Sequence, residues 1–387
     1  MLDFDSLLPF DSANDEDFFS ALPPFAGVCL IEGKTPSAEP LFIRTQDMRR
    51  RLQRLLGRPD AGSKRLNLRE FAGQVRYRVT ASAFEQTLAY YQHAKQIFPK
   101  RYRDMLRMRP PAVLKVNLQN PYPRCYPSRR IAVDASGEPA GGVYFGPFPS
   151  RRAAEAFAEG VLDFFKVRRC RIKILRDPAF PGCIYSEMKM CLAPCFGGCS
   201  KEEYASEVAR LVAFLESGGG SLRAEFENER ARASEGLQFE LAAAFHKKIE
   251  KLDGALRGQP ELTRRIQDLQ AVILQRANGE QAIAAYAVRR GMIDDAPLEI
   301  HFGEIAGQPR SAEQFFREYL EKKPARRAGN SEELSEHLWL LARWYYGNPR
   351  QGEIFFLEKD WPYRKMMRAC SRLLAPPEDG KPQNPAS

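Results

Sequence analysis

Five cysteines fall within one central stretch of the chain, and their spacing is the first sign of chemistry. Cys170, Cys183, Cys191 and Cys195 follow the pattern C-x12-C-x7-C-x3-C, and Cys199 follows after a further x3 interval. Four thiolates that converge from a loop can hold a tetrahedral zinc ion or a cubane iron–sulfur cluster. Structural zinc more often uses a C-x2-C knuckle, which this segment lacks, and buried thiols without metal are the third alternative. The spacing therefore indicates a metal site and leaves zinc and iron–sulfur open.

Basic side chains gather in repeated clusters along the first half of the chain. Each phosphate that they neutralise releases counterions, and a planar guanidinium can bind two oxygens at once, so clustered arginine favours a polyanion. A solvated basic face is the alternative for any single cluster, but repetition over more than a hundred residues favours nucleic acid. The bases beside the cysteines are also expected to favour thiolate. The clusters are Arg49, Arg50, Arg51 and Arg54; Lys100, Arg101, Arg103, Arg107 and Arg109; and Arg129, Arg130, Arg151, Arg152, Arg168, Arg169 and Arg171.

Carboxylates suited to metal-dependent nuclease chemistry are scarce in the first hundred residues. A phosphodiester nuclease needs at least one carboxylate to hold a divalent metal beside an electrophilic Arg or Lys. The helix expected to start at Ser82 carries Glu85 as its only acid before residue 104. This region therefore supplies the arginines without an evident metal site.

Hydrophobic periodicity predicts the elements that must position these residues. Residues 27–31 and 41–43 are typical of short strands, and Asp47 begins a predicted basic helix with one apolar face. Residues 74–80 alternate like a half-buried strand, and Ser82 is the expected N-cap of the next helix. Together these elements predict a compact α+β unit.

Further along the chain, we expect strands, a helical hairpin and a second α+β unit. Ser200 and Glu203 form a capping-box sequence, and the glycines at 218–220 separate that helix from a second one with an apolar stripe from Leu237 to Leu252. The expected fold class is therefore α+β, in several domains. The predicted divisions are an acidic disordered tail at 1–22, an α/β unit at 23–105, a strand and helix linker with the cysteine cluster at 106–199, a helical hairpin at 200–257, an α/β unit at 262–372 and a disordered tail at 373–387.

Composition limits the class of protein. The chain has 387 residues, enough for about two or three domains, with 59 Lys and Arg against 49 Asp and Glu. No apolar run approaches the ~20 residues of a membrane span. Eight cysteines are too few for a disulfide scaffold in a chain of this length. We therefore expect a protein of the reducing cytoplasm that binds no membrane.

Three motifs, in this order, resemble the UvrC family of the bacterial UvrABC excinuclease. Residues 144–150 read YFGPFPS and are similar to the family's YFGPY motif, and residues 191–195 read CLAPC, as in the family. Residues 233–243 read ASEGLQFELAA and resemble the UVR motif, the hairpin with which the family contacts UvrB. The resemblance covers roughly residues 24–358.

The resemblance implies a cofactor and a partner. It implies a [4Fe-4S] cluster on the first four cysteines of the cluster, with Cys199 left over. It also implies that Leu237, Phe239 and Glu240 contact UvrB. Phe239 lies about two residues off the apolar stripe, so it is expected to point outward, although packing between the two helices is the alternative.

The first unit resembles a GIY-YIG nuclease domain but departs from it at the catalytic positions. Cys29 and Leu41 stand where the family has the tyrosines of GIY and YIG. Tyr90 stands where the family has its metal-binding Glu, and a protonated phenol cannot replace a carboxylate as a ligand for Mg²⁺ or Mn²⁺. Arg44 and Arg51 keep the positive charge of the family's Lys and catalytic Arg.

The resemblance also implies a second nuclease that is incomplete. Residues 284–357 resemble the opening of the family's RNase H-like domain, and we expect the chain to end before the acidic core. The sequence therefore predicts a nuclease-degenerate adaptor or regulator of excision repair that binds DNA and UvrB, alone or in the UvrA–UvrB complex. The alternatives are a GIY-YIG-type endonuclease that makes a single incision with Mg²⁺ or Mn²⁺, and a protein-interaction module without DNA. The predicted DNA contacts are Arg44, Arg49, Arg50, Arg51 and Arg54.

Overall fold

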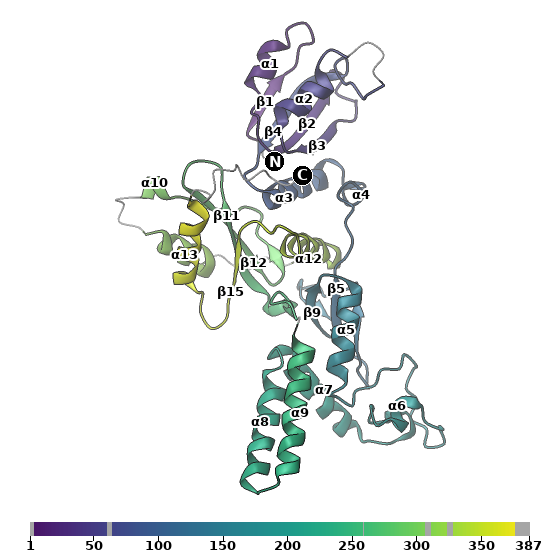
Figure 1. The fold of residues 1–387 in the computed structure, drawn as a ribbon. Coiled ribbons are helices and arrows are strands. Elements are labelled where there is room, and N and C mark those ends of the chain that lie inside the picture. The colour runs from purple at the N-terminus through teal and green to yellow at the C-terminus, as the bar shows by residue number, and fades with distance from the viewer. Residues whose placement is uncertain (1–3, 60–63, 258, 306–310, 323–327, 376–387) are drawn as a thin grey trace.

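The chain forms an elongated molecule in which small units follow one another (Figure 1). This computed structural model describes residues 4–59, 64–257, 259–305, 311–322 and 328–375. A sheet with its helices lies at one end, and two long helices project from the other. Within these described ranges, no helix is both long and apolar enough to cross a membrane.

The N-terminal unit is a four-stranded antiparallel sheet, in the order β1-β4-β2-β3, with helices on both faces. On β2, Val28 and Leu30 pack with α3, whereas Cys29 and Ile31 pack with α1 and α2. This alternation places successive side chains on opposite faces, as the strand period requires. The elements are β1 (Ser6–Pro9), α1 (Glu16–Ala21), β2 (Gly27–Gly33), β3 (Leu41–Thr45), α2 (Met48–Leu56), β4 (Ala72–Val79), α3 (Ala83–Ile97) and α4 (Tyr102–Leu106).

Residues 4–22 are folded in the structure, which corrects the disordered tail predicted for 1–22; residues 1–3 lie outside the described part. β1 adds to the sheet beside β4, and α1 lies against α2. The side chains of Phe10, Phe18 and Leu22 are buried in the core beside α2. Despite its acidic composition, this segment has an apolar face large enough to hold it in place.

The middle unit holds a second antiparallel sheet in the order β10-β9-β5-β6, with α5 packed against it. The cysteine segment follows α5 as a loop that contains only two short helices. The elements are β5 (Ala112–Val116), β6 (Cys125–Ser128), β7 (Ala132–Val133), β8 (Pro139–Ala140), β9 (Val143–Phe148), α5 (Arg151–Leu162), α6 (Ile184–Glu187), η1 (Pro194–Phe196) and β10 (Arg264–Arg265).

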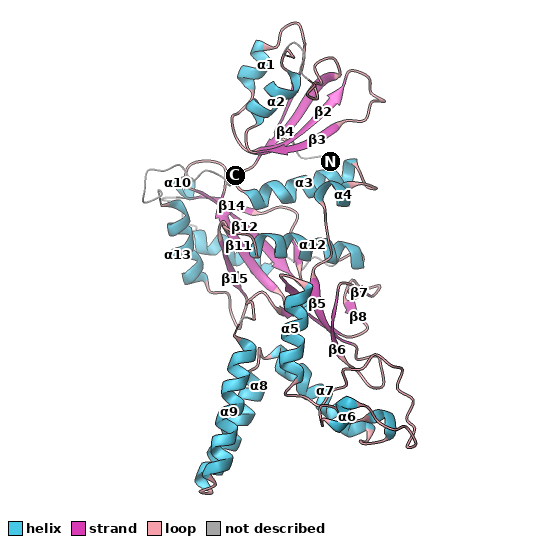
Figure 2. Cartoon of the chain, turned by 45° about the vertical axis from the view of Figure 1, so that its right-hand side comes forward, coloured by secondary structure: helices cyan, strands magenta, loops and turns pink. Residues whose placement is uncertain are grey.

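The region predicted as a hairpin of two helices contains three. They are α7 (Lys201–Glu216), α8 (Gly220–Glu235) and α9 (Phe239–Leu256). The break falls after α8, where Leu237 adopts a φ of +54°. Ile249 and Leu252 of the predicted apolar stripe are buried, whereas Leu237 is exposed. The long antiparallel pair that projects from the molecule is therefore α8 and α9 (Figure 2).

The last unit is an antiparallel sheet in the order β13-β12-β11-β15, with β14 also on β12. β11 is a buried strand that the sequence analysis did not identify. The elements are η2 (Ile266–Asp268), β11 (Gln270–Arg276), β12 (Ala282–Arg289), β13 (Met292–Ile293), β14 (Leu298–His301), α10 (Phe302–Ile305), α11 (Ala312–Arg317), η3 (Glu318–Lys322), α12 (Ser331–Tyr345), β15 (Glu353–Phe356) and α13 (Tyr363–Leu374).

A buried carboxylate joins the N-terminal unit to α12. Glu336 accepts hydrogen bonds from Tyr91 Oη at 2.8 Å, Arg103 Nε at 2.7 Å and Lys95 Nζ at 3.1 Å, and from Tyr102 Oη at 2.5 Å. Burial alone would raise the pKa of Glu336, but these donors outweigh it and hold the pKa below its ordinary value. The charged network fixes α3 and α4 against α12.

Candidate nucleic-acid pocket and cysteine cluster

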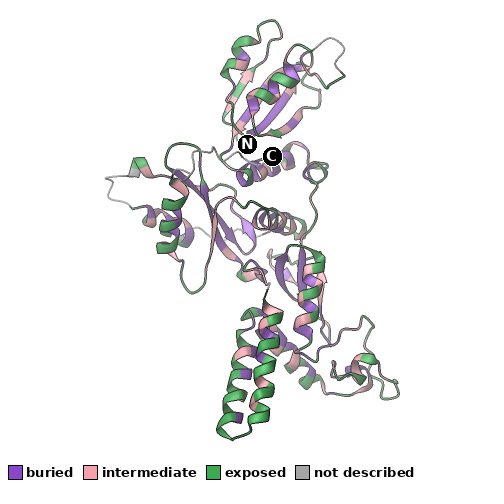
Figure 3. Ribbon diagram, in the orientation of Figure 1, coloured by how far each residue is buried: buried purple, intermediate pink, exposed green. Residues whose placement is uncertain are grey.

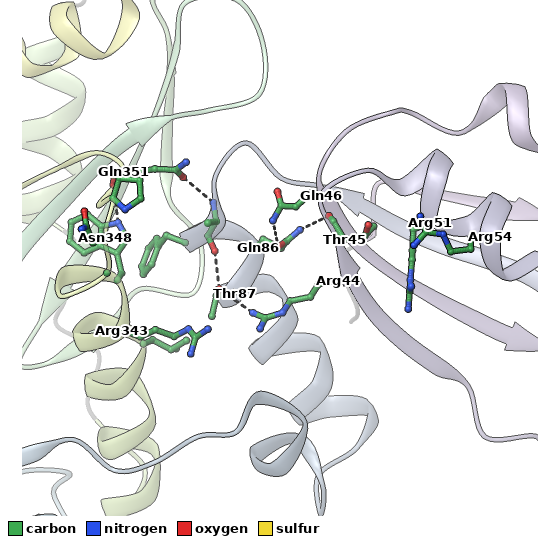
Figure 4. A pocket seen from close by; sticks show the side chains of 16 residues that line it. Arg44, Thr45, Gln46, Arg51, Arg54, Gln86, Thr87, Arg343, Asn348 and Gln351 are labelled. Atoms are coloured by element: carbon green, nitrogen blue, oxygen red, sulfur yellow. Dashed lines mark hydrogen bonds between the residues drawn. The ribbon is translucent and has the colours of Figure 1, made fainter. Parts of the chain in front are cut away.

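An arginine-lined pocket of about 720 Å³ lies between the N-terminal unit and α12 (Figure 4). β3, α2 and the first turn of α3 form one wall, and α12 with the loop at 347–351 forms the other. Its lining holds four arginines and no Asp or Glu. The arginines are Arg44, Arg51, Arg54 and Arg343.

Arg44 and Arg343 reach toward each other from opposite walls of the pocket (Figure 4). Arg44 donates a 3.4 Å hydrogen bond from Nη1 to Thr87 Oγ1. Burial, followed by the nearby charge of Arg343, lowers the pKa of Arg44. Two like charges are thus held together without a carboxylate among the pocket residues, so an anion between them would relieve their repulsion.

The arginines of α2 lie on different sides of the helix. Arg51 and Arg54 are three residues apart and both line the pocket, because the opposite face of α2 is buried in the core. Arg49, predicted to bind DNA, instead donates from Nε to Leu22 O at 2.8 Å and from Nη2 to Ser20 O at 3.2 Å. It therefore holds the end of α1 against α2. Arg50 is exposed and does not line the pocket.

The positions that depart from the GIY-YIG pattern are packed as core. Cys29 is fully buried against α2, and burial raises the pKa of its thiol to about 12. Leu41 packs partly buried against the same cluster. Tyr90 stacks on Phe42 with ring centres 4.6 Å apart and donates its hydroxyl to Phe42 O at 3.3 Å. None of these three side chains lines the arginine pocket.

Glu85, which lies between the pocket residues Phe84 and Gln86 in sequence, is engaged elsewhere. Its Oε2 accepts from Ala81 N at 2.8 Å, and its Oε1 lies 3.7 Å from Arg78 Nη2. Burial raises its pKa, against the lowering effects of that hydrogen bond and of Arg78. It does not line the pocket, so no carboxylate stands ready to hold a metal there.

One wall of the pocket was missed by sequence reasoning. Arg343 and the loop that carries Asn348 and Gln351 come from the last unit, more than 240 residues from α3 in sequence. The loop is fixed because Gln351 Oε1 accepts from Ala83 N at 3.3 Å, and Gln351 O accepts from Trp344 Nε1 at 2.9 Å. No local pattern marks such a contact, since it depends on how the two units pack.

The four cysteines of the predicted metal set line one small cavity of about 230 Å³. Its other walls are largely apolar, and the cavity lies in the loop after α5. Cys199 does not line it and is buried in the core that α7 shares with α5. The structure thus brings together the set of Cys170, Cys183, Cys191 and Cys195.

The thiols are close enough to share a cavity but do not form a tight ligand cage. Among the described residues, no group of three or more His, Cys, Asp or Glu side chains is arranged to hold a metal ion. Arg168 Nη1 lies 3.8 Å from Cys170 Sγ, and Ala193 N donates to Cys191 Sγ at 3.3 Å. Burial raises the pKa of the Cys191 thiol to about 11.

The turn between α8 and α9 exposes apolar side chains at the end of the projecting hairpin (Figure 3). Leu237 is 73% exposed, Phe239 67% and Leu241 44%, and Glu240 beside them is also exposed. Phe239 and Leu241 therefore do not serve to pack the two helices together.

Comparison with known proteins supports the interpretation of the middle unit. Residues 112–214 match the family described as UvrC/Cho excinuclease, middle domain, a stretch that includes β5, β9, α5 and all five clustered cysteines. This part of the chain is therefore similar to the middle domain of the UvrC/Cho family. No solved structure matches the chain.

Curated relatives extend the similarity to UvrC on both sides of that domain. The UvrABC system protein C of Carboxydothermus hydrogenoformans is 30% identical over 53% of this chain and 33% of its own length. The protein of the same name from Ectopseudomonas mendocina is 27% identical over 79% of this chain and 45% of its own length. The UvrABC system protein C of Syntrophus aciditrophicus is 29% identical over 46% of this chain and 28% of its own length. The chain thus spans less than half the length of these UvrC proteins.

Proposed function

We propose that this chain is a UvrC-related, DNA-binding adaptor or regulator of nucleotide excision repair that does not cut DNA through its N-terminal unit. The arginine pocket is the observation that carries the proposal. Four guanidinium groups converge there, and none of the four forms an ion pair with a residue in the described part of the chain. Phosphate oxygens suit this arrangement, because guanidinium binds them in a forked geometry.

Phosphate binding and phosphodiester cleavage require different chemical groups. Arg44, Arg51 and Arg343 can hold backbone phosphates from two walls, and the first turn of α3 adds its favourable dipole. Cleavage would also need a carboxylate to hold a divalent metal, and the pocket lining has none. The arrangement therefore supports binding, and it gives no support to the single-incision endonuclease.

The experiment is a gel shift and an incision assay in the same tubes. A lesion-bearing duplex is mixed with the protein, UvrA, UvrB, ATP and either Mg²⁺ or Mn²⁺. We expect a shifted complex and intact strands. A cut that Arg51→Ala abolishes would show that the N-terminal site is an active nuclease, and no shift at any protein concentration would reject DNA binding.

A [4Fe-4S] cluster on the four cavity cysteines is the second part of the proposal. The donor set fits, because four thiols line a single cavity and the remaining walls are mostly apolar, although the thiols must move closer to act as ligands. Zinc is the alternative cofactor. Bound there, either group would link a loop with little hydrophobic core to α5 and α7.

Substitution of the cavity cysteines tests the cofactor. The double variant Cys191→Ser/Cys195→Ser should lose bound iron, with its visible absorption, or zinc, measured by elemental analysis of protein purified without oxygen. Cys199→Ala is the matched control, because Cys199 lies outside the cavity. Equal metal content in wild-type and double-variant protein, or no metal in either, would contradict the proposal.

The exposed hairpin end supports UvrB as the partner. Solvent-exposed Leu237 and Phe239 lie at the far end of α8 and α9, away from the arginine pocket. An exposed apolar patch of this kind fits a hydrophobic groove on another protein.

A further inference from the structure

A second pocket, of about 470 Å³, lies along the N-terminal half of α12 and is separate from the arginine pocket. Residues of α12 form one side of the pocket, and residues around β5 and before β7 form the other. Its lining combines apolar side chains with cations. Tyr144, the first residue of the YFGPFPS stretch, lines this pocket, but the function proposed above assigns it no role.

The apolar part of the pocket suits a flat ring. Trp339 is half-buried, Ile131 is buried, and Met108 packs partly buried beside them in the same core cluster. An indole exposed at a pocket wall offers a stacking surface that accepts any nucleobase.

Two arginines of the pocket, Arg129 and Arg130, are free for a ligand, whereas the acids of the pocket are not. Arg129 and Arg130 are exposed, and neither forms an ion pair within the residues that the structure describes. Both acids in the lining, Glu332 and Glu336, are bound by Arg103. The pocket therefore has an excess of unpaired positive charge next to an aromatic wall, the combination that binds an aromatic anion.

The two pockets meet on α12. Trp339 lines the second pocket, Arg343 lines the first, and the Arg343 guanidinium carbon lies 5.3 Å from the centre of the Trp339 ring. The residues are four apart, so they are neighbours along one ridge of the helix. A strand whose phosphates occupy the first pocket can pass directly to the second.

We propose that the second pocket binds one nucleotide, with its base against Trp339 and its phosphate at Arg129 and Arg130. The inference rests on the proposed DNA binding for its link to the first pocket. The nucleotide belongs either to a DNA strand or to the pool of free nucleotides, since both offer the same base and phosphate.

The test uses two probes. The first is a single-stranded oligonucleotide with one 2-aminopurine, followed by its emission and by anisotropy; the second is AMP, followed by protein tryptophan emission. We expect Trp339→Leu to weaken oligonucleotide binding at least about fivefold and to remove the quenching of 2-aminopurine. Trp339→Phe, which keeps an aromatic ring, should retain most of the oligonucleotide affinity and most of the quenching. Arg129→Ala/Arg130→Ala, changed at exposed positions, should weaken binding without altering the fold.

The outcomes distinguish nucleotide binding in the second pocket from DNA binding in the arginine pocket. Unchanged affinity and quenching in Trp339→Leu and in the double arginine variant would overturn this inference, even if Arg51→Glu/Arg343→Glu weakens DNA binding. Loss in Trp339→Leu with no effect of Arg51→Glu/Arg343→Glu would support the second pocket and reject the first. Saturable binding of AMP that Trp339→Leu removes would identify free nucleotides as ligands, and a response to the oligonucleotide alone would identify a DNA strand.

Discussion

At the scale of single residues, the pocket depends on which arginines the fold leaves unpaired. Arg44, Arg51 and Arg54 were predicted as DNA contacts, and the structure places all three on one pocket. Arg49 was grouped with them because a run of arginines looks uniform in sequence, but its guanidinium is used by the carbonyls of α1 and the residue after it. The sequence around Arg343 did not indicate a DNA contact, since the neighbours of Arg343 in the pocket come from a distant part of the chain.

Tyr90 gives a prediction at this scale. We expect Tyr90→Phe to lower the free energy of unfolding by about 0.5–1.5 kcal/mol, because it removes the hydroxyl hydrogen bond to Phe42 O and keeps the ring stacking. Urea unfolding measures the change. DNA affinity should stay within twofold of wild type; a large loss of affinity with unchanged stability would instead make Tyr90 part of the binding site.

At the scale of elements, the starts of helices were predictable and one helix break was not. The N-caps at Asp47 and Ser82 were predicted, and each side chain accepts a hydrogen bond from the first turn of its helix. The same holds for the capping box at Ser200. The break at 236–238 was missed because a single helix was predicted to follow the glycines at 218–220, whereas the chain reverses at the break.

The hairpin gives a prediction at this scale. We expect Phe239→Ala to change the free energy of unfolding by less than about 0.5 kcal/mol, because the side chain is 67% exposed, and to weaken UvrB binding at least several-fold. Calorimetric titration with UvrB and urea unfolding provide the two measurements.

A buried residue of the same helix is the matched control for Phe239. Leu252→Ala should cost about 2–5 kcal/mol of stability, since Leu252 is fully buried. If Phe239→Ala binds UvrB as tightly as wild type, the end of the hairpin is not the docking surface.

At the scale of the whole molecule, the packing of the two α+β units creates the site. The main hydrophobic core contains residues of α3 and of α12 together, so the wall that bears Arg44 and the wall that bears Arg343 are held in one body. The α+β fold class and the strands β2, β3 and β4 followed from periodicity. The packing of the two units did not, because the contacts join segments more than 200 residues apart. The RNase H-like character of the last unit stays a prediction.

The Glu336 network gives a pH-dependent prediction. The folded pKa of Glu336 is lowered, so its charged form stabilises the protein above the ordinary glutamate pKa of about 4.3, and this contribution is lost as the pH falls through the folded value. We expect Glu336→Gln to cost about 1.5–3 kcal/mol at pH 7. The difference from wild type should shrink as the pH falls below about 4. Equal stability of the two proteins at pH 7 would contradict this role.

The salt dependence of DNA binding tests the central claim most directly. Fluorescence anisotropy with a labelled duplex, measured over a series of salt concentrations, compares wild type with Arg51→Glu/Arg343→Glu and with Arg230→Glu. Arg230 is an exposed residue of α8, a helix that lies at the end of the molecule opposite the N-terminal sheet (Figure 1). We predict at least tenfold weaker binding and a salt slope reduced by about 1–2 for the pocket variant, with little change for Arg230→Glu. An unchanged slope and affinity in the pocket variant would show that DNA does not bind at this site.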